Sequence, residues 1–399
     1  MKIKKVKNQP KQITKYPEID PKEQDAVESV NEIFKTPLTG AYNWDYIVVD
    51  DRIKKLYELG KKLNWNEDFD LDWSQDFPKD QFLINSDIFK TPEVELDGYD
   101  DLSFEKKIEM DRHRVSWNLS QFLHGEQGAL LVASQLVSCA PTFNAKLYAA
   151  SQTFDEARHV NCFNRYLKEK IGFQYPSTDG LKSLMDKILT DERWDLKFIG
   201  MQIIIEGLAL AAFNNLKLIL NDGLLKQLLH YVIRDEARHV TFGVNYLEDY
   251  LKTLSKSEIE DRAQFAFEAC VVMRDRLISG EVISRFLDYT PEEAHKIAEE
   301  SEQGENFKNL LFTKIIPNLT RIGLITDKVK PKYEKLGVLS YQELEDNFNV
   351  DWAEISKPYE TQEEIEQEIS SVFEIYLAPL LPSLTIILSG PIDKIFFVI

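Results

Sequence analysis

The chain has 399 residues, of which 43% are hydrophobic, enough for a sizeable core in one large domain or in two to three average ones. Its 67 acidic and 48 basic residues give a formal net charge of -19, so we expect neither nucleic acid nor an acidic carrier protein as a partner. Three widely spaced cysteines, and a lysine-rich start with no apolar segment behind it, predict a reduced, cytoplasmic protein.

Residues 1–100 are polar, and prolines interrupt them before any long helix can form. Three tryptophans of this part, Trp44, Trp65 and Trp73, need a surface to pack on. We therefore expect an irregular N-terminal extension that wraps around a helical body.

Residues 101–290 are predicted to form a helical bundle, because apolar residues recur there at helical spacing between clear breaks. The long helices are expected at about 103–138, 142–171, 194–220 and 224–254. Pro141 separates the first two, and an Asn-Asp-Gly turn separates the last two. A shorter helix is expected around 181–189.

The remaining sequence predicts further helices at about 258–286 and 291–302, a weaker one before Pro331, and no set of alternating strands. The fold class is therefore all-α, with residues 291–399 forming a helical C-terminal extension and an apolar tail. Prolines, glycine and charges interrupt the apolar stretch 375–399 before it reaches a spanning length, so we expect a packed or partner-docking tail and no membrane span.

One motif, Asp-Glu-Ala-Arg-His, occurs twice, at 155–159 and at 235–239. Each copy follows a lone glutamate, and the glutamate of the motif comes 30 residues after it, so the second set repeats the first after a shift of 80 residues. Within each copy the glutamate and the histidine are three residues apart and project from one face of a helix. The simplest explanation is a displaced copy of a helix pair.

A single charged motif of this kind could equally be a solvated helix face with local ion pairs. Glu206 argues against that alternative, since it lies in the apolar run 203–213 and its only polar helical neighbour is Gln202. An unpaired buried carboxylate is costly, so Glu206 should be protonated, paired with a cation or bound to metal. Glu126, its counterpart 80 residues earlier, lies on a similar apolar stripe.

Four glutamates and two histidines on four helices suit a pair of oxygen-reactive metal ions. The candidate metal ligands are Glu126, Glu156, His159, Glu206, Glu236 and His239, and the four glutamates are also the candidate catalytic residues. The other histidines are assigned to surfaces or to ordinary packing; they are His113, His124, His230 and His295.

The aspartates of the two motifs need a role as well. A metal-bound imidazole normally donates its other N–H to a carboxylate, so Asp155 and Asp235 could each serve the histidine of the opposite helix. Arg158 and Arg238 would then neutralise this outer layer. Simple ion pairs between each arginine and the aspartate of its own helix are the alternative.

Residues 105–250 resemble the ferritin-like di-iron carboxylate superfamily, and the doubled D-E-x-R-H is most similar to its oxygenase branches, including bacterial multicomponent monooxygenases. The six ligand positions carry over one by one. The resemblance implies a ferritin-like four-helix bundle, two iron ions or a manganese–iron pair, and dioxygen as co-substrate.

Three residues near the ligands depart from patterns in this superfamily. Phe163 stands where the small subunits of ribonucleotide reductase usually place a radical-forming tyrosine. Val232 stands where N-oxygenases similar to p-aminobenzoate oxygenase have an additional histidine. Leu210 stands where multicomponent monooxygenases often have a threonine.

The leading hypothesis is a non-haem di-iron oxygenase or oxidase that acts on a small organic substrate by hydroxylation, N-oxygenation or desaturation. No dinucleotide or flavin fingerprint and no cysteine cluster appears, so an external reductase or ferredoxin is expected as electron donor. A homodimer is common in the superfamily. Two alternatives remain open: a metal and radical protein like the ribonucleotide reductase small subunit, and a ferroxidase or iron-handling protein.

Overall fold

The computed structural model describes residues 34–36, 39–44, 46–48, 50–86, 89–275, 279–301 and 311–359. The chain divides into two compact units, Met1–Ser356 and Lys357–Ile399, and the helices described below belong to the first. The lysine-rich start and the apolar tail 375–399 lie outside the described residues. The division into segments 1–100, 101–290 and 291–399 stays a prediction.

The regular structure of the described ranges is helical, which confirms the all-α class. An isolated β bridge joins Ile84 and Leu220.

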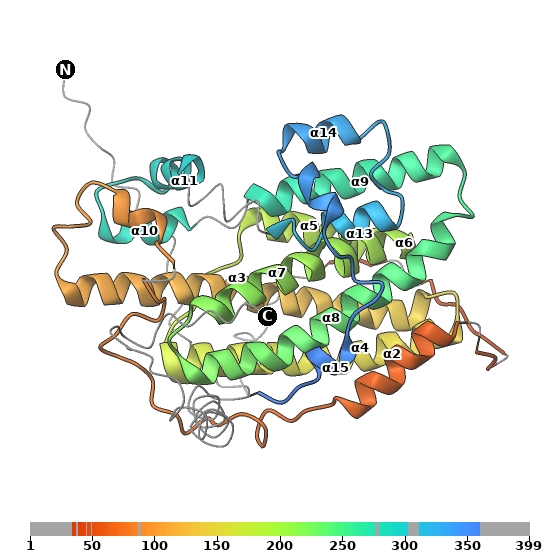
Figure 1. Cartoon of the computed structure of the whole chain (residues 1–399), viewed down its shortest axis with the longest axis horizontal. Coiled ribbons are helices and arrows are strands. Elements are labelled where there is room, and N and C mark those ends of the chain that lie inside the picture. Colours follow the sequence, from red (N-terminus) through yellow and green to blue (C-terminus); the bar gives the residue numbers. More distant parts are fainter. Residues whose placement is uncertain are drawn as a thin grey trace, which may run out of the picture. The chain divides into compact units, whose positions relative to one another are not determined.

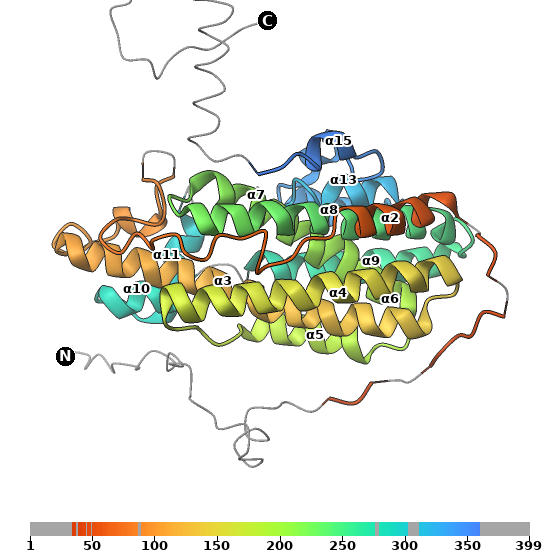
Figure 2. The same cartoon turned by 90° about the horizontal axis from the view of Figure 1, so that it is seen from below.

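Four long helices run side by side in the two perpendicular views (Figures 1 and 2). They are α3 (Phe104–Cys139), α4 (Phe143–Tyr166), α7 (Glu206–Ile219) and α8 (Gly223–Leu251). Helix α3 packs on α4, α7 packs on α8, and α4 contacts α8. The expected four-helix bundle is therefore confirmed.

The ends of these helices follow from capping residues. The side chains of Ser103, Thr142 and Asp222 each accept a hydrogen bond from a backbone N–H in the first turn of α3, α4 and α8. Such caps satisfy N–H groups that have no partner within the helix. The predicted starts at 103, 142 and 224 lie within one residue of the observed ones for this reason.

The helix that carries Glu206 changes its geometry along its length. It begins as α6 (Trp194–Phe198), continues as the π-helical segment η3 (Ile199–Ile205) and ends as α7. The segment Trp194–Ile219 is long and apolar enough to cross a membrane by composition alone, but all of its most apolar window is buried in the protein. This helix is the apolar centre of the bundle. A second π-helical segment, η2 (Leu167–Ile171), extends α4.

Helix α2 (Asp51–Lys62) corrects the expectation of an irregular N-terminal extension. The interval between Pro37 and Pro78 contains no proline, so a helix has room there. Asp50 caps it, and its buried residues include Ile53 and Leu56. Helix α2 packs against both α4 and α8, the two helices that carry the repeated motif.

The three N-terminal tryptophans differ in their surroundings. Trp65 is buried and Trp73 packs against the main core, as expected. Trp44 is 83% exposed, so the prediction that it packs was wrong.

Shorter helices cover the bundle. They are η1 (Pro92–Glu95), α5 (Asp179–Thr190), α9 (Lys256–Asp275), α10 (Gly280–Phe286), α11 (Pro291–Glu300), α13 (Ile316–Arg321), α14 (Lys330–Lys335), η4 (Leu339–Glu343) and α15 (Trp352–Ile355). The single helix expected at 258–286 is instead two helices, α9 and α10. Pro331 lies in the first turn of α14 and so begins a helix, where a proline needs no hydrogen-bonded N–H.

Candidate metal centre

The six predicted ligands converge in the middle of the bundle, one glutamate each from α3 and α7 and an ExxH pair each from α4 and α8. All six side chains are buried. Their potential ligand atoms form two groups, each with atoms within 4.8 Å of one another. Position 1 comprises Glu126, Glu156, His159 and Glu236, and position 2 comprises Glu156, Glu206, Glu236 and His239.

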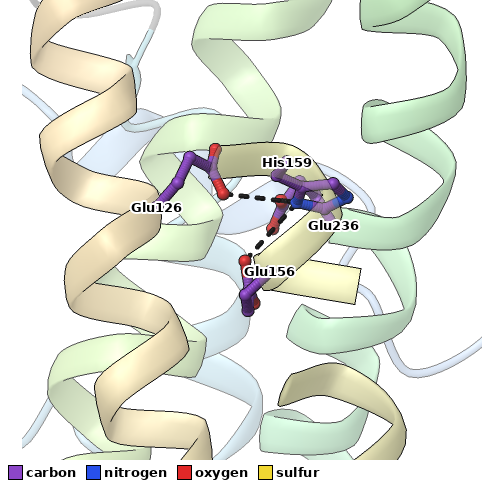
Figure 3. Close-up of side chains that lie close together, drawn as sticks. All are labelled: Glu126, Glu156, His159 and Glu236. Carbon is purple, nitrogen blue, oxygen red and sulfur yellow. Dashed lines mark hydrogen bonds and ion pairs between the residues drawn. The ribbon is translucent and has the colours of Figure 1, made fainter. Parts of the chain in front are cut away.

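Position 1 is shown in Figure 3, where the glutamates surround one edge of an imidazole ring. The Nδ1 atom of His159 lies 3.1 Å from Oε1 of Glu236, 3.2 Å from Oε2 of Glu126 and 3.4 Å from Oε2 of Glu156. One ion at this place could therefore contact one nitrogen and three carboxylates.

Position 2 repeats this geometry around the second histidine. The Nδ1 atom of His239 lies 3.1 Å from Oε1 of Glu156, 3.2 Å from Oε2 of Glu236 and 4.0 Å from Oε2 of Glu206. Glu156 and Glu236 thus turn one oxygen toward each position. This is how a carboxylate is arranged when it bridges two ions.

The opposite nitrogen of each imidazole faces an aspartate from the other helix. Nε2 of His159 lies 3.2 Å from Oδ2 of Asp235, and Nε2 of His239 lies 3.4 Å from Oδ2 of Asp155. The predicted crossed arrangement is therefore present. An aspartate at Nε2 keeps the proton on that nitrogen and leaves Nδ1 free to bind metal.

The two arginines lie between these aspartates. Arg158 Nη2 is 2.6 Å from Asp155 and 3.0 Å from Asp235, and Arg238 Nη2 is 2.6 Å from Asp235 and 2.9 Å from Asp155. Each guanidinium thus bonds the aspartate of its own helix and that of the partner helix. The local ion pairs and the crossed pairs, which the sequence left as alternatives, occur together.

Trp65, in the segment after α2, is an additional contact of this network. Its indole Nε1–H donates a 2.7 Å hydrogen bond to Oδ2 of Asp235, and the guanidinium carbon of Arg158 lies 4.7 Å from its ring centre. The neighbouring Asn64 accepts a hydrogen bond from Arg158. Sequence reasoning did not assign these contacts, because nothing in the spacing connects residues that far apart.

Two buried glutamines also touch the site. The Gln152 amide donates to Oε1 of Glu156 at 2.9 Å and to Oε1 of Glu206 at 3.3 Å. Gln202 Nε2 in turn donates to the Gln152 carbonyl oxygen at 2.5 Å. The signal for them was available, since each glutamine comes one helical turn before a ligand glutamate.

The charges of the cluster displace the pKa values of its members. Burial raises the pKa of Glu126 and of Glu206, and the nearby Glu236 carboxylate raises both further. Burial would also raise the pKa of Glu156, but the nearby imidazoles of His239 and His159 hold it below its usual range. Glu126 and Glu206 therefore hold protons more readily than Glu156 does, because negative charges are crowded in the cluster.

The pKa values of both histidines respond to the same crowding. Burial lowers the pKa of His159 and of His239, but the surrounding carboxylates outweigh burial and raise both values well above the usual range. The crowded carboxylates therefore favour positive charge at this place.

The residues present fit two divalent cations. Among the described residues, Oε2 of Glu156 and Oε1 of Glu236 are buried without a hydrogen-bond partner, which is unusual for carboxylate oxygens. The four negative charges of the glutamates would balance two divalent ions. The two aspartates are already balanced by the two arginines.

The remaining histidines have other roles, as predicted. His113 Nδ1 lies 2.8 Å from the Tyr175 hydroxyl, and His124 Nε2 lies 2.9 Å from the Tyr175 carbonyl oxygen. His230 lies beside Lys217, and His295 is only partly buried.

A small cleft reaches two of the ligands between α3 and the helix of Glu206. Glu126 and Glu206 both line it, and most of its other lining residues are apolar, including Phe122 and Phe213. Its free volume for water-sized molecules is about 20 Å³, close to what one such molecule requires. One water molecule would fit there without rearrangement.

The three residues that depart from superfamily patterns are all buried. The Phe163 ring lies 6.4 Å from the ring of Phe122 and 5.7 Å from that of Phe213, so it forms part of an aromatic cluster beside Glu126. Val232 and Leu210 add no polar group.

The helical bundle and its buried groups of carboxylates and histidines are the arrangement that the resemblance in the sequence predicted. No family model and no curated protein matches the chain. Among solved structures it is similar to an R2-like ligand-binding oxidase with aerobically reconstituted Mn/Fe cofactor, at 16% identity over 72% of this chain and 99% of that chain, with a TM-score of 0.46. A single-residue mutant of such an oxidase, with anaerobically reconstituted Mn/Fe cofactor, gives 18% identity, the same coverages and a TM-score of 0.44.

Proposed function

We propose that this protein is a non-haem di-metal oxygenase or oxidase that uses dioxygen to oxidise a small organic substrate. The observation that carries the proposal is the placement of Glu156 and Glu236, each of which turns one oxygen toward each histidine. The bound ions, two irons or a manganese–iron pair, would supply the electrons and the Lewis acidity for oxygen reduction.

The side chains have distinct proposed roles. Glu126 and Glu206 would each hold one ion, and Glu156 and Glu236 would bridge the two. The histidines would complete the ligand set through Nδ1. Asp155, Arg158, Asp235 and Arg238 would fix the orientation of the imidazoles and balance the charge around them.

The substrate is expected to be small and apolar at its reacting end. The cleft beside Glu126 and Glu206 is the described approach to the ligands, and its aromatic lining offers an organic molecule no charged partner other than these glutamates. A substrate larger than a water molecule would need Phe122 or Phe213 to change position. Neither ring carries a polar group that would oppose such movement.

The electrons that return the oxidised ions to their reduced state would come from outside the chain, from a reductase or a ferredoxin. An iron–sulfur centre would need clustered cysteines, whereas Cys139, Cys162 and Cys270 form no disulfide and are far apart in the sequence. A cytoplasmic location and a homodimer complete the proposal.

The central test is anaerobic loading of the metal-free protein with ferrous iron, followed by measurement of iron per chain. We expect two ions for the wild type and about one for Glu206→Gln, because position 2 loses one of its charged ligands. Glu169→Gln, a change on the exposed surface, is the matched control. Fewer than two ions in the wild type, or no effect of Glu206→Gln, would contradict the di-metal assignment.

Oxygen chemistry then separates the candidate activities. The loaded protein is mixed with oxygen in the presence and absence of a reductant and a panel of small organic compounds. Substrate-dependent oxygen consumption with an oxidised product supports the proposal. A long-lived radical would favour the reductase-like alternative, and iron uptake far above two per chain would favour iron handling.

A further inference from the structure

The two metal positions have identical ligand types but different surroundings. The 80-residue shift that relates the two sets of ligands also pairs their neighbours. Three of these pairs differ sharply: Gln152 with Val232, Gln202 with Phe122, and Gly243 with Phe163. The first member of each pair lies beside position 2. Of the second members, Phe122 and Phe163 belong to the half of the repeat that contains Glu126, and Val232 lies on α8 one turn before Glu236.

The amides beside position 2 form a chain that ends on its carboxylates. Gln202 donates to Gln152, and Gln152 donates to Oε1 of both Glu156 and Glu206. Both glutamine side chains are 0% exposed, so water does not compete for these hydrogen bonds. The amide therefore fixes the orientation of two carboxylates. It leaves Oε2 of Glu206 facing position 2, and in Glu156 it bonds Oε1, the oxygen that itself faces position 2.

Gly243 makes room for this chain on the facing helix. A Cβ atom there would lie 2.4 Å from Cβ and 3.2 Å from Cγ of Gln202. Any larger residue would therefore displace the Gln202 side chain. The three residues act as one arrangement contributed by α4, η3 and α8.

The counterparts of the two glutamines are hydrophobic. Val232 and Phe122 have no side-chain N–H to donate, and Phe122, Phe163 and Phe213 pack with one another at ring-centre distances of 4.7 to 6.4 Å. Glu126 therefore lacks the amide support that Glu206 receives.

We propose that position 2 binds its ion more tightly than position 1 and fills first, with Gln152 as the positioning residue that causes the difference. This inference rests on the proposed di-metal site. A hydrogen bond to a carboxylate also withdraws electron density from it, which would weaken a metal bond. Loss of such outer contacts nevertheless usually lowers metal affinity by about 10–100-fold, so the positioning effect is the larger one.

The test isolates each position by removing the histidine of the other. His159→Ala leaves the ligands of position 2, and His239→Ala leaves those of position 1. Binding of Co²⁺ to each protein is measured by calorimetry without oxygen. We expect position 2 to bind about 10–100-fold more tightly.

The substitution Gln152→Met, which keeps the length of the side chain but removes its donor, is then added to each background. It should weaken Co²⁺ binding by about 10–100-fold in the His159→Ala protein and by less than about threefold in the His239→Ala protein. Gln202→Met should give a smaller loss in the same background. Val232→Ala, at the counterpart position, is the control for a packing change alone, and circular dichroism checks the fold of every variant.

Equal Co²⁺ affinities at the two positions would overturn the inference. So would a result in which Gln152→Met and Gln202→Met weaken Co²⁺ binding at position 1 as much as at position 2. Such a result would leave the di-metal assignment intact, because both ions would still bind. If the wild type binds no divalent ion, the proposed function fails and the inference fails with it.

Discussion

The orientation of His159 and of His239 depends on the aspartate at Nε2 as well as on the glutamates at Nδ1. Each ring turns Nδ1 toward glutamates and Nε2 toward an aspartate of the opposite helix. The sequence could predict the histidines and the crossed aspartates, since a metal-bound imidazole needs a carboxylate behind it.

The Asp235→Asn substitution should weaken metal binding at position 1. The amide is neutral and holds the Nε2 proton of His159 less strongly, so we expect affinity there to fall by about 10–100-fold. Asp155→Asn is the matched change for position 2. Metal retained per chain during dialysis against a chelator measures both. Equal retention by Asp235→Asn and wild type would show that the carboxylate does not support the histidine.

Trp65 and Gln152 mark the limit of sequence reasoning at this scale. The Trp65 hydrogen bond joins residues 170 positions apart, and only the packing of the N-terminal segment brings them together. Gln152 comes one helical turn before Glu156 in the sequence, but its contact with Glu206 depends on how two helices pack. Ligand spacing within one helix is predictable, whereas contacts between elements are not.

Among the elements, the bundle helices were predictable because their ends carry explicit signals. Ser103, Thr142, Asp222 and Pro141 mark the boundaries that the structure shows. The π-helical segment η3 was not predictable, since residues 199–205 are apolar on nearly every side and reveal no period. Helix α2 was missed because the prolines around it suggested disruption throughout.

A pair of glycine substitutions tests the close contact between α8 and η3. Alanine in a helix is usually about 0.5–1 kcal/mol more favourable than glycine. Gly125→Ala on α3 should show that gain, because a Cβ there meets nothing within 4 Å. Gly243→Ala should instead destabilise the metal-free protein by about 1–3 kcal/mol, because its Cβ would overlap Gln202.

Chemical denaturation of the two metal-free variants and the wild type gives the comparison. If both variants change the free energy of unfolding by the same amount, α8 can move away from η3 at little energetic cost.

For the molecule as a whole, a second hydrophobic cluster attaches the helix pair α10 and α11 to α3. His113 lies in its neighbourhood, 5% exposed, with its ring 4.3 Å from Phe173 and 5.3 Å from Phe286. Burial lowers the pKa of His113 to about 4. The imidazole that packs beside Phe286 of α10 is therefore neutral at pH 7.

Acid should weaken the folded protein through this residue. Between pH 6.5 and 4 the unfolded chain protonates His113 while the folded chain does not, so stability is retained above pH 6.5 and lost as the pH falls toward 4. We expect a loss on the order of 2 kcal/mol from this group. The free energy of unfolding at pH 7 and at pH 4.5 is compared for the wild type and His113→Gln. A pH dependence of equal size in both proteins would exclude His113 as a source.

Trp65 gives the metal centre an optical signal of its own. Its ring lies 6.5 Å from the ring of His159, and its N–H ends on the aspartate behind that histidine. Indole emission is sensitive to hydrogen bonding and is quenched by nearby paramagnetic ions. The fluorescence of this one tryptophan among six should therefore change as position 1 fills. Occupancy can then be followed in real time on the unlabelled protein.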